Sequence, residues 1–120
     1  MKLRIRGNSI RLRLSQADLE LLLATGAVEE RVTFPAGQSL RYRLESGAES
    51  AAADLLDRGI VIRFPVEAIE RWAQPEEVSL EAEQSLRDGE RLKLLVEKDF
   101  RCLNSREGED DADLFPNPGG

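Results

Sequence analysis

Apolar and polar residues alternate at the start of the chain. Residues 2–6 read KLRIR and residues 9–14 read SIRLRL, so every second side chain is apolar in both segments. This period of two is typical of a strand that buries one of its faces. Gly7 and Asn8 supply turn residues between the segments, and the pattern therefore predicts a β-hairpin over residues 2–14.

The pattern becomes helical over residues 15–26, which read SQADLELLLATG. Leucines recur there at helical spacing, and Ser15 followed by Asp18 is a favourable helix start. Gly26 marks the expected end, because glycine readily adopts the left-handed conformation that terminates helices. A helix is therefore predicted to follow the first hairpin.

The rest of the chain predicts further strands and a second helix. Pro65 and Pro75 bound the second helix, since proline is tolerated at a helix start and not in its interior. Residues 46–59 leave a short helix and an irregular edge strand as alternatives. The other predicted elements are hairpins at residues 28–45 and 78–100, a strand at residues 59–64 and the helix at residues 65–75.

The two halves of the chain share this pattern after a shift of fifty positions. The matched positions are Ile10, Leu12 and Leu14 with Ile60, Ile62 and Phe64, Leu19 with Ile69, Leu22 with Trp72, Val28 with Val78, and residues 41–44 with residues 91–94. Matches across a strand, a helix and two further strands favour a duplication over chance periodicity.

We therefore predict one α+β domain over residues 1–104, made of two ββαββ half-repeats at about residues 1–50 and 51–104. Together they form a mainly antiparallel sheet of about eight strands with two helices. The sheet is either open or closed into a barrel, because alternation shows which side chains share a face and not which face is enclosed.

Residues 105–120 differ in composition from the rest of the chain. They hold five acidic residues, one arginine, two prolines and three glycines. Such a segment has too little apolar surface to fold alone, and it predicts an acidic, flexible C-terminal tail. One hypothesis is that its acidic run at residues 107–113 folds back across the arginines of the first hairpin.

Composition narrows the classes of function. The 120 residues carry a net charge of −6, which argues against a general nucleic-acid binder. The chain has no histidine, which excludes Ser-His and Cys-His nucleophile pairs and Cys-His zinc sites within one chain. Cys102 is the only cysteine, so no internal disulfide forms. The sequence shows neither a signal-peptide core nor a membrane-spanning run, and a cytoplasmic protein is expected.

The alternation also places charged residues together on the face opposite the apolar side chains. The cationic residues of that face are Lys2, Arg4, Arg6, Arg11, Arg13, Arg41, Arg43, Arg63 and Lys93. Two interpretations stay open: a solvated face that discourages aggregation, or a site where guanidinium groups bind a phosphate-containing anion. Glu81, Glu83 and Glu97 lie on the corresponding face of the second half and are candidate ligands for Mg²⁺ or Mn²⁺.

Three stretches resemble a known family. They are KLRIRGNSIRLRLS at residues 2–15, LVEKDFRCL at residues 95–103 and DLFPNP at residues 113–118. The chain resembles, over nearly its full length, a family of small uncharacterised bacterial proteins with a domain of unknown function. This resemblance implies no known activity.

The order of strand, helix and three strands, present twice over residues 9–100, resembles the CYTH-like fold of triphosphate tunnel enzymes. That resemblance implies an eight-stranded barrel whose interior binds triphosphate through Arg and Lys and metal through Glu. LRYRL at residues 40–44 is similar to the paired-arginine strand of those enzymes. Their Glu-x-Glu-x-Lys strand has no counterpart here, because the nearest stretch, EAEQS at residues 81–85, lies in another strand and lacks the lysine.

These observations favour a non-catalytic domain that binds a small anionic ligand or a protein partner through the arginine-rich face, without a cofactor. The first alternative is a metal-dependent phosphohydrolase that acts on a triphosphate, with Mg²⁺ or Mn²⁺ held by the three glutamates. The second alternative is a structural or interaction protein that binds no ligand.

Overall fold

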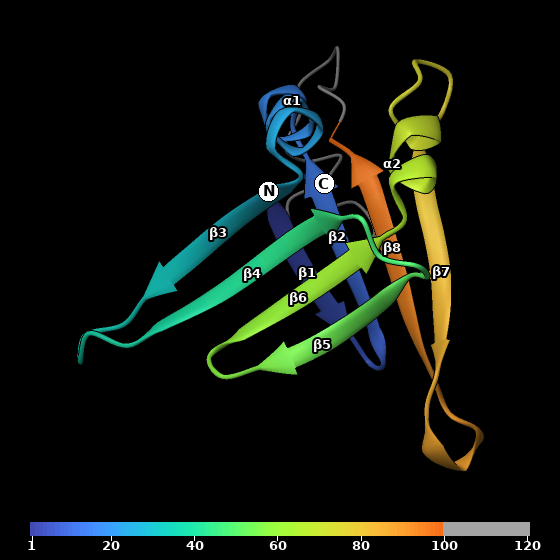
Figure 1. The fold of residues 1–120 in the computed structure, drawn as a ribbon. Helices are drawn as coiled ribbons and strands as arrows, with labels where there is room; N and C mark the ends of the chain where they lie inside the picture. Colours follow the sequence, from blue (N-terminus) through green and yellow to red (C-terminus); the bar gives the residue numbers. More distant parts are fainter. Residues whose placement is uncertain (100–120) are drawn as a thin grey trace, which may run out of the picture.

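The computed structural model describes residues 1–99, which form eight β-strands and two α-helices (Figure 1). The strands are β1 (Lys2–Arg6), β2 (Ser9–Leu14), β3 (Ala27–Thr33), β4 (Ser39–Ser46), β5 (Ala52–Leu56), β6 (Gly59–Phe64), β7 (Ser79–Ser85) and β8 (Arg91–Lys98). The helices are α1 (Gln16–Thr25) and α2 (Val66–Trp72), and a short 3-10 turn, η1 (Arg87–Gly89), joins β7 to β8. The predicted α+β class with eight strands and two helices is confirmed.

The strands form two separate four-stranded sheets. Sheet A has the order β1-β2-β8-β7 and sheet B has the order β3-β4-β6-β5. Hairpins make the outer pairs antiparallel, whereas the central pairs β2–β8 and β4–β6 are parallel. The prediction of a single sheet is wrong, because each half of the chain gives one hairpin to each sheet. The described strands form no closed barrel, since each sheet ends in two edge strands.

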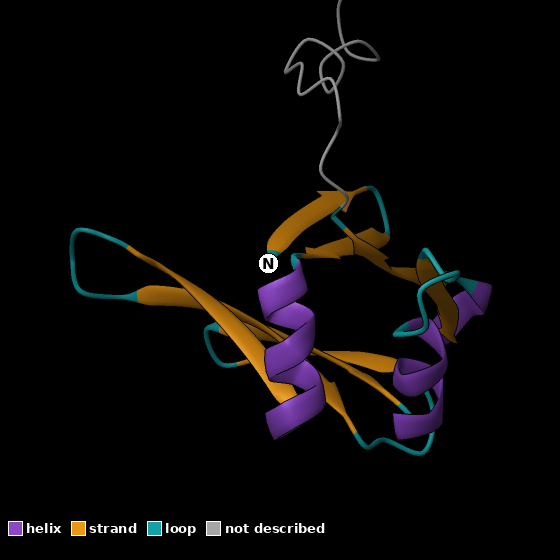
Figure 2. Cartoon of the chain, turned by 90° about the horizontal axis from the view of Figure 1, so that it is seen from above, coloured by secondary structure: helices purple, strands orange, loops and turns teal. Residues whose placement is uncertain are grey.

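The hydrophobic core lies between the inner faces of the two sheets (Figure 2). Leu12 of β2, Leu44 of β4 and Val96 of β8 are fully buried members of one cluster. Each helix connects one sheet to the other and adds to the same cluster, α1 through Leu22 and α2 through Trp72. Burying a side chain of this size contributes roughly 1.5–3 kcal/mol to stability. The core thus fixes the charged positions of both sheets on their outer faces.

Helix α1 begins and ends where the sequence predicts. The Ser15 Oγ accepts a hydrogen bond from the Asp18 N–H at 3.2 Å, and the Ser15 N–H donates to the Asp18 carboxylate at 3.0 Å. Gly26 adopts a left-handed φ of 88°, and its N–H donates to the Leu22 carbonyl at 2.8 Å. These contacts satisfy backbone groups that a helix leaves without partners at its ends.

The ambiguous segment at residues 46–59 contains the edge strand β5 rather than a helix. Its residues pair with β6, and the Ala53 N–H also donates to the Gln84 side chain of β7 at 2.8 Å. This bond links sheet B to sheet A. The turn between β5 and β6 places Arg58 at a φ of 71°, a left-handed conformation that a tight turn demands.

The element order β-β-α-β-β occurs twice, but the offset between the halves is not constant. One residue separates α1 from β3, whereas six residues separate α2 from β7. Val28 therefore corresponds to Leu80, which packs against the core, and not to Val78, which is 52% exposed. The alignment at a constant shift is wrong beyond α2, and the internal repeat itself stays a prediction.

Candidate anion-binding site

The structure places the predicted cationic residues on two different sheets. Lys2, Arg4, Arg6, Arg11, Arg13 and Lys93 lie on the outer face of sheet A, and Arg41, Arg43 and Arg63 lie on the outer face of sheet B. In both sheets the alternate positions hold the core residues, so these side chains point away from the other sheet. The expectation of one charged face is therefore wrong, because the hairpins β1–β2 and β3–β4 belong to different sheets.

Strands β1 and β2 form the basic face of sheet A, which consists of Lys2, Arg4, Arg6, Arg11 and Arg13. The register puts Arg4 directly opposite Arg11 and Lys2 directly opposite Arg13. The Cβ atoms of opposite residues lie about 4.5–5.5 Å apart, and like charges at that separation destabilise a sheet. Two like-charged cross-strand pairs thus stand side by side on this face.

Acidic side chains compensate this charge only in part. The contacts are Glu97 Oε1 at 3.6 Å from Arg11 Nε and 3.8 Å from Arg13 Nη2, and Asp99 Oδ2 at 3.2 Å from Lys2 Nζ. Within residues 1–99, the exposed Arg4 and Arg6 form no salt bridge. An exposed ion pair contributes only about 0–1 kcal/mol, so Glu97 holds Arg11 and Arg13 only weakly.

Two small hollows lie on this face. One of about 250 Å³ is lined by Lys2, Leu3, Arg4, Arg11 and Arg13, and one of about 150 Å³ is lined by Arg4, Arg6, Ser9 and Arg11. Pockets that enclose a drug-sized ligand measure about 300–1,000 Å³, so these hollows match a small anionic group better than a whole organic molecule. Ser9 was missed by the sequence analysis, although the alternation places it on the same face as the arginines.

Carboxylates neutralise two of the three predicted arginines of sheet B. Arg43 Nε donates to Glu45 at 2.5 Å, and Arg63 donates to Glu45 at 2.9 Å and to Asp54 at 2.8 Å. The hydrogen bond from Arg43, aided by Arg63 and opposed by burial, holds the pKa of Glu45 below its usual value of 4.5. These four side chains form an internally paired network rather than an open basic surface.

Arg41, the third predicted arginine of sheet B, is exposed and faces Arg31 across the strand pair. A hollow of about 220 Å³ beside it is also lined by Glu29 and Glu45. An anion in that hollow meets two carboxylates, which repel it. The basic face of sheet A is therefore the stronger candidate for anion binding.

The three predicted metal ligands do not form one group. Glu81 and Glu83 lie on β7, opposite Leu95 and Lys93, whereas Glu97 lies on β8 opposite Ser79. Glu83 accepts a hydrogen bond from Arg91 at 2.9 Å, and Glu97 lies near Arg11 and Arg13. Within residues 1–99, no three His, Cys, Asp or Glu side chains lie close enough together to hold a metal ion. Glu81, Glu83 and Glu97 as metal ligands stay a prediction.

A comparison with protein-family models matches residues 1–119 to a family of unknown function, DUF7009. The chain belongs to this family. The resemblance to a family without known activity is thereby confirmed, while the bacterial source and the CYTH-like resemblance stay predictions. No curated protein and no solved structure matches the chain.

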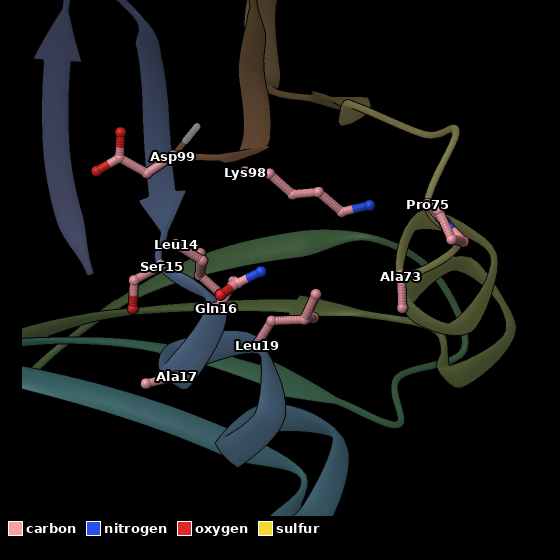
Figure 3. A pocket seen from close by; sticks show the side chains of 9 residues that line it. All are labelled: Leu14, Ser15, Gln16, Ala17, Leu19, Ala73, Pro75, Lys98 and Asp99. Carbon is pink, nitrogen blue, oxygen red and sulfur yellow. The ribbon is translucent and has the colours of Figure 1, made fainter. Parts of the chain in front are cut away.

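A further hollow of about 800 Å³ lies between the two helices (Figure 3). Its lining is Leu14, Ser15, Gln16, Ala17, Leu19, Ala73, Pro75, Lys98 and Asp99. Lys98 Nζ donates to the carbonyls of Gln74 and Glu77, each at 2.7 Å, and the Asp99 carboxylate contacts Lys2. Both charged side chains are thus already bound, and no local motif marks this hollow because its lining comes from three separate segments.

Two further predictions concern the whole chain. Neither helix of residues 1–99 is long and apolar enough to cross a membrane. Cys102 and the acidic tail predicted at residues 105–120 lie outside the described residues.

Proposed function

We propose that this domain of the DUF7009 family is a non-catalytic binding module that holds a phosphate-containing anion on the basic face of sheet A. The main support is the Arg4–Arg11 cross-strand pair with Arg6 beside it, since Arg4 and Arg6 form no salt bridge within residues 1–99. A guanidinium group donates two parallel hydrogen bonds to phosphate oxygens. An anion between these arginines therefore replaces repulsion with paired hydrogen bonds.

The spacing along β1 favours an anion with several charged groups. Lys2, Arg4 and Arg6 occupy alternate positions of one strand, which are about 6.8 Å apart. A linear polyphosphate contacts more than one of them at once, and Arg11 and Ser9 on β2 add donors beside the same path. Inorganic triphosphate is therefore the probe that this face is expected to bind most tightly among simple phosphates.

The openness of the face supports binding without catalysis. The two hollows are small and lie on an outer sheet surface, so water reaches a bound anion from one side. Electrostatic catalysis of phosphoryl transfer relies on a water-excluded site in which fixed groups meet developing charge.

A cytoplasmic location stays a prediction.

Isothermal titration calorimetry with inorganic triphosphate at low ionic strength tests the proposal. The double variant Arg4→Gln, Arg11→Gln is expected to bind at least tenfold more weakly, because hydrogen bonds between charged groups contribute about 1.5–3 kcal/mol each. The control is Arg58→Gln, Arg71→Gln, which changes the net charge equally at two exposed arginines outside sheet A. Equal weakening by both variants, or none by the first, contradicts a site on the basic face.

A further inference from the structure

The acidic segment at residues 107–113 and the basic face of sheet A carry complementary charge. The segment reads EGEDDAD and holds five carboxylates without a basic residue. The basic face carries five cationic side chains, two of which form no salt bridge within residues 1–99. We propose that this segment binds the basic face within the same chain and competes there with the anion, an inference that rests on the proposed function.

The described chain ends at the right place for this contact. The Asp99 carboxylate lies 3.2 Å from Lys2 Nζ, and the Asp99 N–H donates to the Leu14 carbonyl at 2.7 Å. Lys2 is the first residue of β1 and the first cation of the basic face. The chain beyond Asp99 therefore starts beside the surface to which its acidic run is complementary.

The connection is long enough to reach across the face. Four steps along β1 separate Lys2 from Arg6, a span of about 13 Å. Eight steps lead from Asp99 to Glu107, and a chain of that length spans at most about 26–29 Å. A tether that can span two sites gives the group at its end an effective concentration in the millimolar range. Even weak ion pairs then suffice to occupy the face.

Sheet B is a poorer target for the same segment. Its outer face carries Glu29, Glu45 and Asp54 among the arginines. Glu45 and Asp54 already accept hydrogen bonds from Arg43 and Arg63, and Glu29 forms an ion pair with Arg43. An approaching acidic segment meets repulsion there. On the basic face of sheet A, the only carboxylate of residues 1–99 within salt-bridge distance of Arg4, Arg6, Arg11 or Arg13 is that of Glu97.

The first experiment measures competition in the full chain. The test variant neutralises the segment without changing its shape: Glu107→Gln, Glu109→Gln, Asp110→Asn, Asp111→Asn and Asp113→Asn. The control variant neutralises five exposed glutamates that form no salt bridge within residues 1–99: Glu20→Gln, Glu49→Gln, Glu67→Gln, Glu70→Gln and Glu76→Gln. At low ionic strength, triphosphate is expected to bind the test variant about tenfold more tightly than the control, because several exposed ion pairs of up to about fivefold each no longer compete. Equal affinity of the two variants overturns the inference and leaves the proposed function intact.

The second experiment detects the contact without any ligand. The Nε–Hε signals of Arg4, Arg6 and Arg11 in nuclear magnetic resonance spectra of the full chain are expected to shift when the segment is neutralised. Those of Arg71 are expected to stay in place, and the shifts are expected to be independent of protein concentration. Unshifted signals overturn the inference even if no phosphate binds. Shifts that grow with protein concentration assign the segment to a second copy of the chain and also overturn it.

Discussion

Arg4 is expected to destabilise the fold whenever no anion occupies the basic face. Its register partner is Arg11, and directly opposite like charges change stability by roughly 0.2–1 kcal/mol. Arg4→Gln removes the repulsion, and Arg4→Glu, with nearly the same shape as glutamine, replaces it with attraction. In a chain whose segment 107–113 is neutralised, unfolding free energy is therefore expected to rise by roughly 0.2–1 kcal/mol for Arg4→Gln and by about twice that for Arg4→Glu. At about 4 °C per kcal/mol, the larger change raises the midpoint of thermal unfolding by roughly 2–8 °C.

Thermal unfolding followed by circular dichroism at low ionic strength measures this order of stabilities. In 1 M NaCl the Debye length is about 3 Å, so the differences are expected to shrink strongly. Adding Arg11→Glu to Arg4→Glu recreates a like-charged pair, and the coupling in the double-mutant cycle is expected to show repulsion again. If the acidic segment binds the basic face as proposed, the gain is expected to be smaller in the unaltered chain, because Arg4 is then already neutralised. The reasoning fails if Arg4→Glu is no more stable than Arg4→Gln at low salt, or if the order of stabilities survives in 1 M NaCl.

Three other changes test the fold and its ion pairs. Leu44→Ala, in the centre of the core, is expected to lower the free energy of unfolding, measured in urea, by about 2–5 kcal/mol. A loss below about 1 kcal/mol would show that the two sheets are not packed through this residue. Because the hydrogen bond from Arg43 lowers the pKa of Glu45, this pairing stabilises the fold above pH 4.5 and is lost as the pH falls through the lower, folded-state pKa. The difference in unfolding free energy between the wild type and Glu45→Gln is therefore expected to close in acid. Gly59→Ala places a Cβ 2.8 Å from the Arg41 carbonyl oxygen, so the parallel strands β4 and β6 must separate and the unfolding midpoint is expected to fall. An unchanged midpoint would contradict this close approach.

Local structure could be predicted from the sequence because its causes are local. The alternation around Leu12 gives a strand with one buried face, and Ser15, Asp18 and Gly26 bound a helix through contacts within a few residues. The outward position of Arg11 and Arg13 follows from the same alternation, since neighbouring positions belong to the core.

Long-range pairing could not be predicted in the same way. The parallel contact of β2 with β8 joins residues more than eighty positions apart, and nothing in either strand marks its partner. That pairing decides that Arg11 and Arg43 lie on different sheets, although their local patterns are alike. The two-residue change in the offset between the halves could not be predicted either, because the longer loop after Trp72 puts Leu80 in the position expected for Val78. Lys98 contacts the carbonyls of Gln74 and Glu77 only because the fold brings distant segments together.

The separation of charge across sheet A explains how a chain with a net charge of −6 keeps a basic face. One row of register partners runs from Arg4 through Arg11 and Leu95 to Glu81, so cations gather at the β1 edge and carboxylates at the β7 edge. Neighbouring strands lie about 4.7–4.9 Å apart, which puts Glu81 about 14 Å from Arg4 along the row. That distance exceeds the Debye length of about 8 Å at physiological ionic strength, so Glu81 screens Arg4 only weakly. Under the proposed function, a polyanion is therefore expected to follow the β1–β2 cations along β1 rather than to lie across the sheet, because its far end would then meet the carboxylates of β7.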